Sequence, residues 1–521
     1  MKLLRKPISL FTFSCVVSIG TLLLYNIPFF SYAANNTNEN VGGKLFLLVS
    51  LVVIMLVVNF MMTYLMLFLM RIVGRILLAI LSFINATALY FVYTYSVIID
   101  EITIGNVFNT RYSEASGFFS WSLWLFILVF GVLPALYCLL QPVVIGKAKK
   151  LGVYCGSSLA IVLVLALMNI NQTLWIGQHD TELGGLLQPW SYLVNTIRVI
   201  NIKHNKQAEE IKLPDGRITD NEKTAVVLVI GESARKANFQ LYGYQRDTNP
   251  LLSKQEGLKV YQATSCATYT TAGVKAILEP VNSDDLYELL PNYAFRTGVD
   301  VSWRTSNWGE PPIHVDEYLN VEKLGEKYPD EFKYHDAILI KGLRERIESS
   351  KKNKVLIVLH TSTSHGPCYV SKYPKKFEVY KPVAKNVEEG EKNVGRLVNA
   401  YDNTIRYTDF LLDSLINTLR SMNDWNSAMI FISDHGESLG ENKVFMHGIP
   451  MRLAPKVQYE IPFLVWTSDK FRDYKPVGEL PEVLEQHYIF HSVLNLLSID
   501  SPAYNKDYDV FKTKDTMKKD K

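Results

Sequence analysis

The sequence predicts a chain in two parts: a membrane α-helical domain with five transmembrane helices, and an α/β sandwich built on a mostly parallel sheet. Two observations support this prediction. The 48% hydrophobic fraction of the 521 residues is concentrated in the first 170 residues, where long apolar runs follow one another. Beyond residue 222, short β-branched runs alternate with helical patterns, which is typical of a parallel sheet covered on both faces.

Five apolar stretches are long enough to cross a hydrocarbon core, which takes about 20 helical residues. They cover residues 8–30, 44–70, 75–98, 118–141 and 152–170. The first follows basic residues, as in a signal peptide, but no small-residue cleavage site follows it cleanly, so we expect a retained helix. The stretches contain almost no ionisable residues, which favours an anchor or a platform for lipid access over a transport pore.

Basic residues occupy alternate loops of this region: Lys2, Arg5, Lys6, Arg71, Arg75, Lys147, Lys149 and Lys150. The intervening loops, "NNTNENVGGK" and "DEITIGNVFNTRYSEASG", have few basic residues. Because basic loops remain in the cytoplasm, we expect the N-terminus inside and everything after the fifth stretch outside.

A connector follows the last apolar stretch. In "LLQPWSYLVNTIRVI", Trp190 and Tyr192 predict either a helix in the membrane interface or an ordinary packed helix of the soluble domain. A polar linker with a turn at Pro214-Asp215-Gly216 comes next. The predicted organisation is therefore a membrane domain at 1–170, an interfacial helix and linker at 171–222, and a catalytic domain at 223–521.

Charge and cysteine content exclude several classes of protein. A net charge of +3 is far below that of a domain-wide nucleic-acid binder. Three of the five cysteines lie in apolar stretches, so a disulfide-dense scaffold is excluded and only Cys266 and Cys368 remain outside them. A bond between these two and a pair of free thiols are both open.

Polar residues follow the predicted strands "TAVVLVIGES", "GVDVSWRTS", "NKVLIVLHTS", "SAMIFISDHG" and "YEIPFLVWTS". Glu232 closes the first run, His360 and His365 follow the third, and Asp434 and His435 close the fourth. In doubly wound folds the carboxyl ends of parallel strands meet at one crevice. We therefore expect these side chains to converge.

Two carboxylates and an imidazole, from Glu232, Asp434 and His435, suit zinc with one position left for a hydroxyl group. The threonine-rich turn "SCATYTTAGV", residues 265–274, leads into a helical pattern and is the expected source of that hydroxyl. A threonine at a helix N-terminus beside a metal is activated to attack a phosphate. Alone, the threonine cluster also fits a helix cap and the Asp-His pair a structural role; together in one domain they favour a site.

Five segments resemble, in order and spacing, the phosphoethanolamine transferases of Gram-negative envelopes. They are "VIGESARKANFQLYGYQRDTNP", "SCATYTTAG", "HTSTSHGP", "AYDNTIRYTD" and "ISDHGESLGENKVFMHG". The resemblance covers nearly the whole chain and implies an alkaline phosphatase-like fold for the soluble domain. It also implies a multi-pass protein of the bacterial inner membrane, with the catalytic domain in the periplasm.

The family pattern implies a zinc ion with four protein ligands: Glu232, Thr270, Asp434 and His435. Thr270 is the implied nucleophile because the family's reactive threonine stands four residues after the cysteine of its "SC" dipeptide. Thr268 and Thr271 stay open as alternatives.

Other positions follow or depart from the same pattern. His365 and His447 match family histidines near the substrate phosphate, whereas His360 fits a structural role equally well. The loop "WRTSNWGEPP", residues 303–312, departs from members that place a lysine there. "TAGVKAILEPV" also lacks the second cysteine of the usual local bridge.

The implied reaction is transfer of phosphoethanolamine from phosphatidylethanolamine to lipid A or lipooligosaccharide, through a covalent intermediate on the threonine. Another envelope glycan or a protein stays open as the acceptor. We expect the protein to be a monomer. The alternative is a phosphoglycerol transferase of the lipoteichoic acid synthase type. A sulfatase would need a C/S-x-P-x-R context, which "CATYT" does not provide. A non-catalytic envelope receptor would not need the glutamate, threonine, aspartate and histidine together.

Overall fold

The computed structural model describes residues 6–37, 40–109, 115–205, 210–283, 285–331, 335–471 and 480–511. Lys2 and Arg5, which contribute to the predicted orientation, lie outside these ranges. The chain divides into two compact units, Met1–Lys206 and Gln207–Lys521. The boundary between the two units, after Lys206, falls inside the predicted connector at 171–222. The domain boundaries at 170 and 222 therefore stay predictions.

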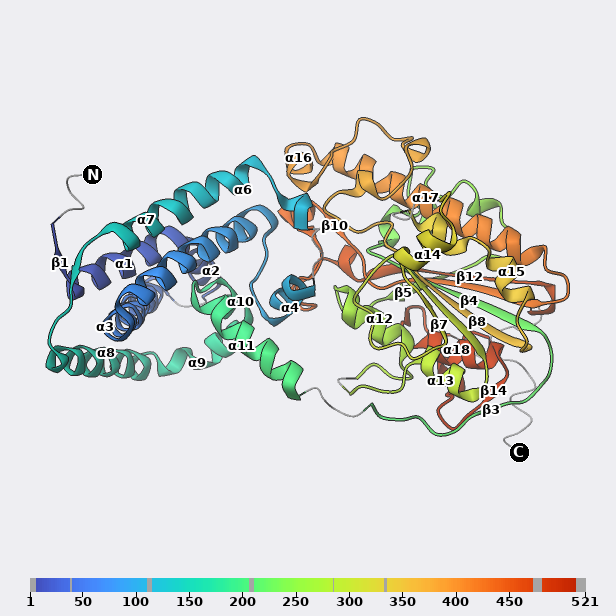
Figure 1. Ribbon diagram of the computed structural model, residues 1–521, viewed down its shortest axis with the longest axis horizontal. Coiled ribbons are helices and arrows are strands. Elements are labelled where there is room, and N and C mark those ends of the chain that lie inside the picture. The colour runs from blue at the N-terminus through green and yellow to red at the C-terminus, as the bar shows by residue number, and fades with distance from the viewer. Residues whose placement is uncertain are drawn as a thin grey trace. The chain divides into compact units, whose positions relative to one another are not determined.

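The first unit is helical (Figure 1). Its helices are α1 (Leu10–Tyr25), α2 (Ile27–Asn36), α3 (Val41–Tyr95), α4 (Glu101–Asn109), α6 (Trp121–Phe126), α7 (Leu133–Leu140), α8 (Ala148–Met168), α9 (Thr173–Gln178), α10 (Asp180–Leu186) and α11 (Trp190–Asn205). A π-helical segment at Ile127–Val132 joins α6 to α7, so that these three form one continuous helical run.

The number of membrane-spanning helices differs from the prediction. Among the described residues, three helices are long and apolar enough to cross a membrane, or four if the bent pair α1 and α2 is one span, so the predicted count of five is not confirmed. The difference arises at α3, whose 55 residues cover both the second and the third predicted stretch. Its 55 residues are more than twice the about 20 that one span requires. Its backbone is non-helical at Arg71 (φ 42°, ψ −107°), between the two stretches.

Helix α11 packs inside the first unit. The indole Nε1 of Trp190 donates to Oδ1 of Asn59, and the hydroxyl of Tyr192 donates to Oδ1 of Asn85, each at 3.0 Å. Asn59 and Asn85 both lie on α3. These bonds satisfy two buried asparagine side chains of α3, as buried polar groups require. The alternative that this segment is a helix of the soluble domain is therefore wrong, because its partners lie in the first unit.

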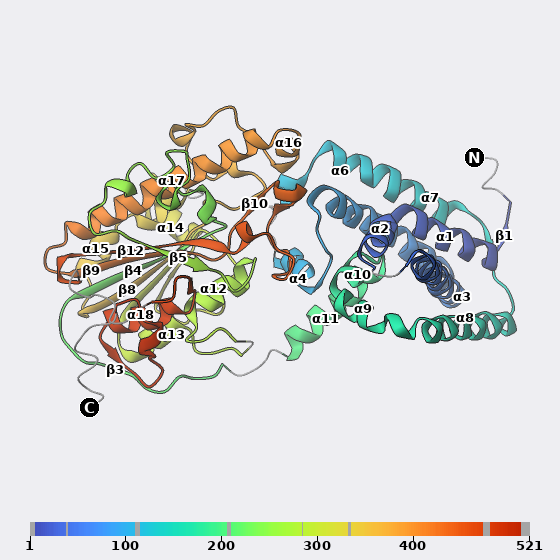
Figure 2. The same ribbon diagram turned by 180° about the vertical axis from the view of Figure 1, so that it is seen from behind.

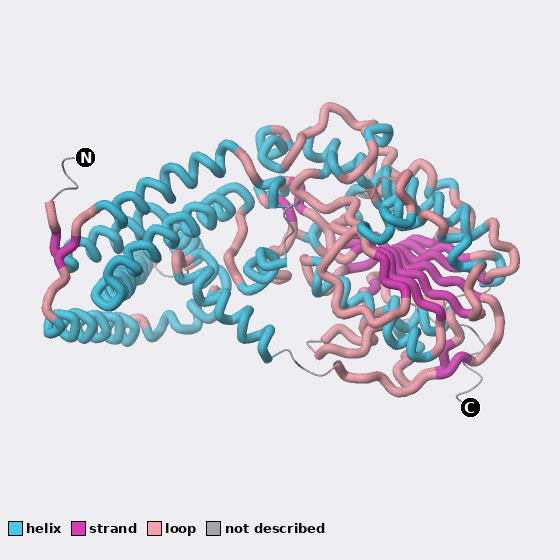
Figure 3. Tube along the Cα trace, viewed as in Figure 1, coloured by secondary structure: helices cyan, strands magenta, loops and turns pink. Residues whose placement is uncertain are grey.

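The second unit is built around an eight-stranded sheet (Figure 3). The strand order is β13-β5-β12-β9-β4-β8-β6-β7. The strands are β4 (Thr224–Gly231), β5 (Lys259–Thr264), β6 (Asp300–Thr305), β7 (Glu317–Leu319), β8 (Lys354–His360), β9 (Asn426–Ser433), β12 (Glu460–Thr467) and β13 (Leu484–Glu485). All five predicted runs are strands. Only β12 runs against its neighbours, so the sheet is mixed rather than purely parallel.

Helices cover both faces of this sheet (Figures 1 and 2). One face carries α12 (Thr270–Leu278), α13 (Leu290–Thr297) and α18 (Tyr488–Leu496), whose apolar side chains share one core with the strands. The other face carries α14 (Val321–Lys327), α15 (Leu343–Glu348) and α17 (Val394–Arg420). Every residue of β4, β8 and β9 is buried, which explains why these strands read as continuous apolar runs.

Strand register brings the predicted site residues to one edge. Gly231 pairs with Ser433, and His360 pairs with both Ile230 and Thr305, so β4, β6, β8 and β9 end at the same level. Beyond β9, a short hairpin of β10 (Ser438–Leu439) and β11 (Phe445–Met446) turns the chain back. This hairpin returns His447 to the edge where Asp434 and His435 lie.

Candidate functional site

Four predicted ligand groups meet at the imidazole of His435. Its Nε2 lies 3.5 Å from Oε1 of Glu232, 3.4 Å from Oδ2 of Asp434 and 3.4 Å from Oγ1 of Thr270. Oγ1 of Thr270 is also 3.3 Å from Oε2 of Glu232. All four side chains are buried. The structure therefore brings together residues from β4, α12 and β9 that are up to about two hundred positions apart.

Backbone contacts fix the orientation of these groups. Nδ1 of His435 is 2.8 Å from the carbonyl oxygen of Gly436, which assigns the proton to Nδ1 and leaves the lone pair of Nε2 facing the oxygens. Oδ1 of Asp434 accepts hydrogen bonds from the backbone N–H groups of Ser233 (3.0 Å) and His435 (2.7 Å). Ser233 has a φ of 51°, in the left-handed region, which turns its N–H toward Asp434.

A cation fits the space between these atoms. Oδ2 of Asp434 is buried and receives no hydrogen bond from any described residue, and a lone pair of His435 faces two carboxylates. Zinc–oxygen and zinc–nitrogen bonds of about 2.0–2.2 Å separate neighbouring tetrahedral ligands by roughly 3.3–3.6 Å. The distances from Nε2 of His435 to one oxygen each of Glu232, Asp434 and Thr270, 3.4–3.5 Å, agree with that spacing. Among the described residues, one ligand atom each of Glu232, His435 and His447 also lie within 4.8 Å of one another, close enough to share a metal ion.

The two buried carboxylates at the site also require a positive charge beside them. Burial and the charge of Glu232 raise the pKa of Asp434 well above its usual range. Burial would also raise the pKa of Glu232, but His365, His435 and His447 together lower it. Two adjacent buried carboxylates cannot both ionise without a cation between them, so one holds a proton unless a metal replaces it. Burial and the neighbouring His447 lower the pKa of His435 to about 4, which keeps the ring neutral and able to bind a metal.

Helix α12 presents Thr270 at its first position. Gly273, one turn later, packs against the end of β9: a Cβ at this glycine would lie 2.3 Å from the carbonyl oxygen of Asp434. The absence of a side chain therefore allows the helix to approach Asp434 and His435. Of the alternatives, Thr268 donates its hydroxyl to the carbonyl oxygen of Ile449 at 2.6 Å, in a loop contact.

The two further histidines line the same site. The ring centroids of His435 and His447 are 4.3 Å apart, and those of His447 and His365 are 5.4 Å apart. Nδ1 of His447 is 2.7 Å from Oε2 of the buried Glu437. Although burial opposes it, the charge of Glu437 raises the pKa of His447 to about 9.

Sequence reasoning did not select several residues that complete the site. Nδ2 of Asn307 donates to Oε2 of Glu232 at 2.6 Å, and His360 lies directly behind Asn307. Glu437 stands two positions after His435 inside a quoted motif, which was an available signal. Gln486 lies outside every motif, and only its position in the fold reveals it.

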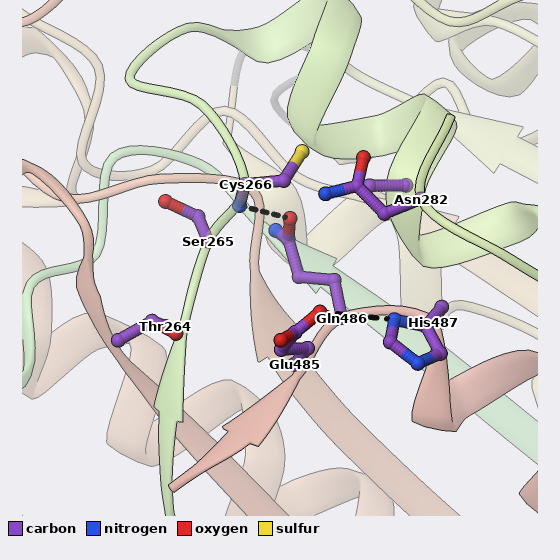
Figure 4. Close-up of a pocket in the computed structure, with 8 residues that line it drawn as sticks. Thr264, Ser265, Cys266, Asn282, Glu485, Gln486 and His487 are labelled. Atoms are coloured by element: carbon purple, nitrogen blue, oxygen red, sulfur yellow. Dashed lines mark hydrogen bonds and ion pairs between the residues drawn. The ribbon is translucent and has the colours of Figure 1, made fainter. Parts of the chain in front are cut away.

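Gln486 connects the threonine-rich turn to the end of β9. Its Nε2 donates to the carbonyl oxygens of Ser433 (3.1 Å) and Asp434 (2.7 Å), and its Oε1 accepts from the backbone N–H of Cys266 (3.1 Å). Figure 4 shows Gln486 between Cys266 and His487, on the wall of a cavity of about 180 Å³. All five cysteines are free thiols in the structure, and burial raises the pKa of the Cys266 thiol to about 11.

The fold and the site together define a class of protein. Residues 224–499, more than half of the chain, match the family model described as Sulfatase. This match places the second unit in the alkaline phosphatase superfamily.

The comparisons then identify the family. Residues 57–204 match a second family model, described as Phosphoethanolamine transferase EptA/EptB. The phosphoethanolamine transferase EptA of Helicobacter pylori is 36% identical, with 98% of each chain covered. The protein of the same name from Escherichia coli K12 is 28% identical over 82% of this chain and 84% of its own.

A solved structure shares the fold of the entire chain. The integral membrane lipooligosaccharide phosphoethanolamine transferase A from Neisseria meningitidis superposes with a TM-score of 0.83 at 24% identity, covering 96% of this chain and 98% of its own. This chain belongs to the phosphoethanolamine transferases. It is a multi-pass membrane enzyme with a C-terminal soluble domain.

Proposed function

We propose that this enzyme transfers phosphoethanolamine from phosphatidylethanolamine to lipid A or a related lipooligosaccharide, by way of a phosphoethanolamine ester on Thr270. The single observation that carries the proposal is the hydroxyl of Thr270, which lies 3.3–3.4 Å from a carboxylate and an imidazole at the N-terminus of α12. The names of two relatives support the choice of donor and acceptor. Mcr-1 is a phosphatidylethanolamine transferase, and another relative is a Kdo(2)-lipid A phosphoethanolamine transferase.

Glu232, Thr270, Asp434 and His435 would hold Zn²⁺. When bound, the ion lowers the pKa of the threonine hydroxyl and offsets the charge of the two carboxylates. The chain supplies the remaining functions. Asn307 and the backbone of Ser233 orient the two carboxylates, and the exposed N–H groups at the start of α12 favour a bound phosphate.

Before the first step, the hydroxyl of Thr270 releases its proton to solvent. Its Oγ1 then forms a bond to phosphorus while the bond from phosphorus to the glycerol oxygen breaks. Diacylglycerol leaves, and its oxygen takes a proton. His365 or His447 provides that proton or offsets charge on the phosphate, because the ring of His447 lies beside His435 and the ring of His365 lies beside His447. In the second step an acceptor oxygen attacks phosphorus, Thr270 leaves, and the same histidines take the acceptor's proton.

The first unit would supply the location of this chemistry. We propose five spans, with α3 contributing two that meet at Arg71, in the inner membrane of a bacterium. The second unit would then lie in the periplasm, beside its lipid donor. Anchoring raises the encounter rate because donor and acceptor are confined to the same plane. We propose that the protein acts as a monomer.

Thr270→Ala tests the nucleophile. With the purified chain in nanodiscs that contain phosphatidylethanolamine labelled in ethanolamine, we expect label to become bound to the wild-type enzyme at Thr270 and not to the variant. Thr271→Ala, one position along the same helix, serves as the control and should retain labelling. A labelled Thr270→Ala protein would refute the assignment.

Two further measurements separate the substrates. Labelled phosphatidylglycerol in place of phosphatidylethanolamine tests the phosphoglycerol alternative, because only a phosphoglycerol transferase would retain that headgroup. Mass spectrometry of lipid A from cells with and without the protein tests the acceptor. If lipid A is unmodified and another glycan carries the phosphoethanolamine, that glycan is the acceptor.

A further inference from the structure

The loop between β6 and β7, residues 306–316, packs directly on Thr270. Gly309 has a φ of 89°, a conformation that side chains rarely adopt. A Cβ at this position would lie 3.3 Å from Cγ2 of Thr271 and 3.5 Å from Cγ2 of Thr270. The backbone of the loop therefore forms one wall around the methyl group of the proposed nucleophile.

The same loop holds a proposed metal ligand. Nδ2 of Asn307 donates to Oε2 of Glu232 at 2.6 Å and to the carbonyl oxygen of Thr361 at 2.8 Å. Both amide hydrogens are thus directed to strong acceptors, which fixes the orientation of the amide. Oε2 of Glu232 is the oxygen that faces the hydroxyl of Thr270.

A buried histidine and a carboxylate stand behind Asn307. Nε2 of His360 lies 3.2 Å from Nδ2 of Asn307, and Nδ1 of His360 lies 3.4 Å from Oε2 of Glu310. Because Nδ2 of Asn307 can only donate, Nε2 of His360 presents its lone pair to that group, and Nδ1 carries the proton that faces Glu310. Oε1 of Glu310 accepts the hydroxyl of Tyr318 on β7 at 2.5 Å. The side chains of His360 and Glu310 are 0% and 10% exposed, so solvent does not replace these contacts.

We propose that Glu310 is a positioning residue for the transfer reaction, acting through His360 and Asn307 on Glu232. The loop that carries Glu310 also places Gly309 against Thr270, so one anchored segment holds both a metal ligand and the nucleophile. The proposal rests on the proposed roles of Glu232 and Thr270. It gives His360 a function in the site and assigns a role to the chain's own loop sequence, "SNWGE".

Glu310→Gln is the decisive variant. It preserves the size of the side chain and the bond to Tyr318, but it presents an N–H group to Nδ1–H of His360. We expect zinc affinity, measured by competition with a chelator, to fall by about ten-fold, in the range found when ligand-orienting partners are removed. We expect kcat to fall by a similar factor, with KM for phosphatidylethanolamine changed less than about three-fold, because the loss is in orientation rather than in binding.

Glu317→Gln is the matched control, since it neutralises a partly buried carboxylate on β7 that pairs with Arg346 and not with the site. It should lower thermal stability at least as much as Glu310→Gln while leaving zinc affinity and kcat unchanged. Equal zinc affinity and equal kcat in the two variants would overturn the proposal.

A double-variant cycle tests the route of action. If Glu310 acts through Asn307, then Glu310→Gln combined with Asn307→Ala should bind zinc no more weakly than Asn307→Ala alone. Additive losses would contradict that route. Measuring zinc affinity also in a Thr270→Ala background, where no turnover occurs, keeps this outcome independent of the nucleophile assignment.

Discussion

Glu437 determines how His447 is oriented. Its side chain is fully buried, with Oε2 2.7 Å from Nδ1 of His447 and Oε1 accepting the hydroxyl of Tyr369 at 2.5 Å. With Nδ1 bound in this way, His447 keeps Nε2 available for a phosphate oxygen or a metal ion. The carboxylate and histidine therefore act as a pair.

Glu437→Gln should lower the rate of phosphoethanolamine transfer by roughly ten-fold or more, since the amide keeps the shape but removes the negative charge that favours a protonated ring. Steady-state transfer in nanodiscs is the measurement. Glu441→Gln in the same hairpin, where the carboxylate pairs with Arg235, provides the control. If the two variants retain the same activity, Glu437 has no special role.

Single residues show both the reach and the limit of sequence reasoning. Glu232, Thr270, Asp434 and His435 were predictable because each lies in a recognisable segment at the end of a strand or the start of a helix, and the structure places them together. Their roles as ligands and nucleophile stay predictions. Asn307 was not predictable, because its contact with Glu232 depends on β6 lying beside β8, and strand order is not encoded in any local pattern.

At the scale of elements, helix α12 depends on its close approach to β9. Gly273 occupies the contact, and a Cβ there would lie 2.8 Å from the carbonyl carbon of Asp434. Since backbone lies on both sides of this contact, neither side can yield by rotating a side chain. The position of Thr270 relative to Asp434 and His435 therefore depends on one missing methyl group.

Gly273→Ala should displace the start of α12 and lower transfer by about 100-fold, the loss that a shift near 1 Å can produce in an active site. Gly395→Ala on α17 is the matched control: its nearest neighbour, Oδ1 of Asn393, is 3.4 Å from an added Cβ. We expect that control to be active and slightly stabilised, since alanine favours helix. Full activity of Gly273→Ala would show that the contact is not restrictive.

Helix α18 is joined to its surroundings by a neutral histidine. Nδ1 of His491 accepts the backbone N–H of Asn505 at 3.0 Å, and Nε2 is 2.8 Å from the carbonyl oxygen of Pro280. Burial lowers the pKa of His491 to about 4. Because the unfolded chain binds the proton more readily, with a pKa near 6.5, this contribution to stability is present above about pH 6.5 and is lost as the pH falls toward 4.

The stability of the soluble domain should therefore decrease between pH 7 and pH 5, with His491 accounting for about 2 kcal/mol of the loss. Thermal unfolding of the purified chain at both pH values is the measurement. In His491→Gln, which cannot take up a proton, the decrease should be smaller by that amount. Identical pH dependence in the two proteins would exclude His491 as the cause.

At the scale of the whole molecule, basic residues in the loops predict the orientation in the membrane. The described basic residues Lys6, Arg75 and Lys147 lie at or near the ends of apolar stretches, at positions that the charge rule assigns to the cytoplasm. A reporter enzyme that is active only after export should be inactive when inserted at Gly146 and active when fused after Lys521. A reporter that is fluorescent only in the cytoplasm should show the reverse. The same result at both positions would contradict the proposed topology.

At the same scale, the number of membrane spans depends on one residue. Two apolar stretches are separated in the sequence by Arg71 and Arg75, and α3 runs through both with non-helical φ and ψ angles at Arg71. Such angles interrupt the hydrogen-bond ladder of a helix, so α3 is two helices joined at a kink, and the kink lies at the boundary between the two predicted stretches.

The sequence by itself determined the class of each unit, five of the eight strands and the motif residues, because buried β-branched runs, apolar length and motif spacing are local properties. It did not predict β5, β7 and β13, which alternate in burial or are only two or three residues long. Tertiary structure alone decided which strands are neighbours. That choice placed Asn307 on Glu232, Gly309 on Thr270 and Gln486 on Asp434, since contacts between distant segments follow from how the layers pack rather than from any local pattern.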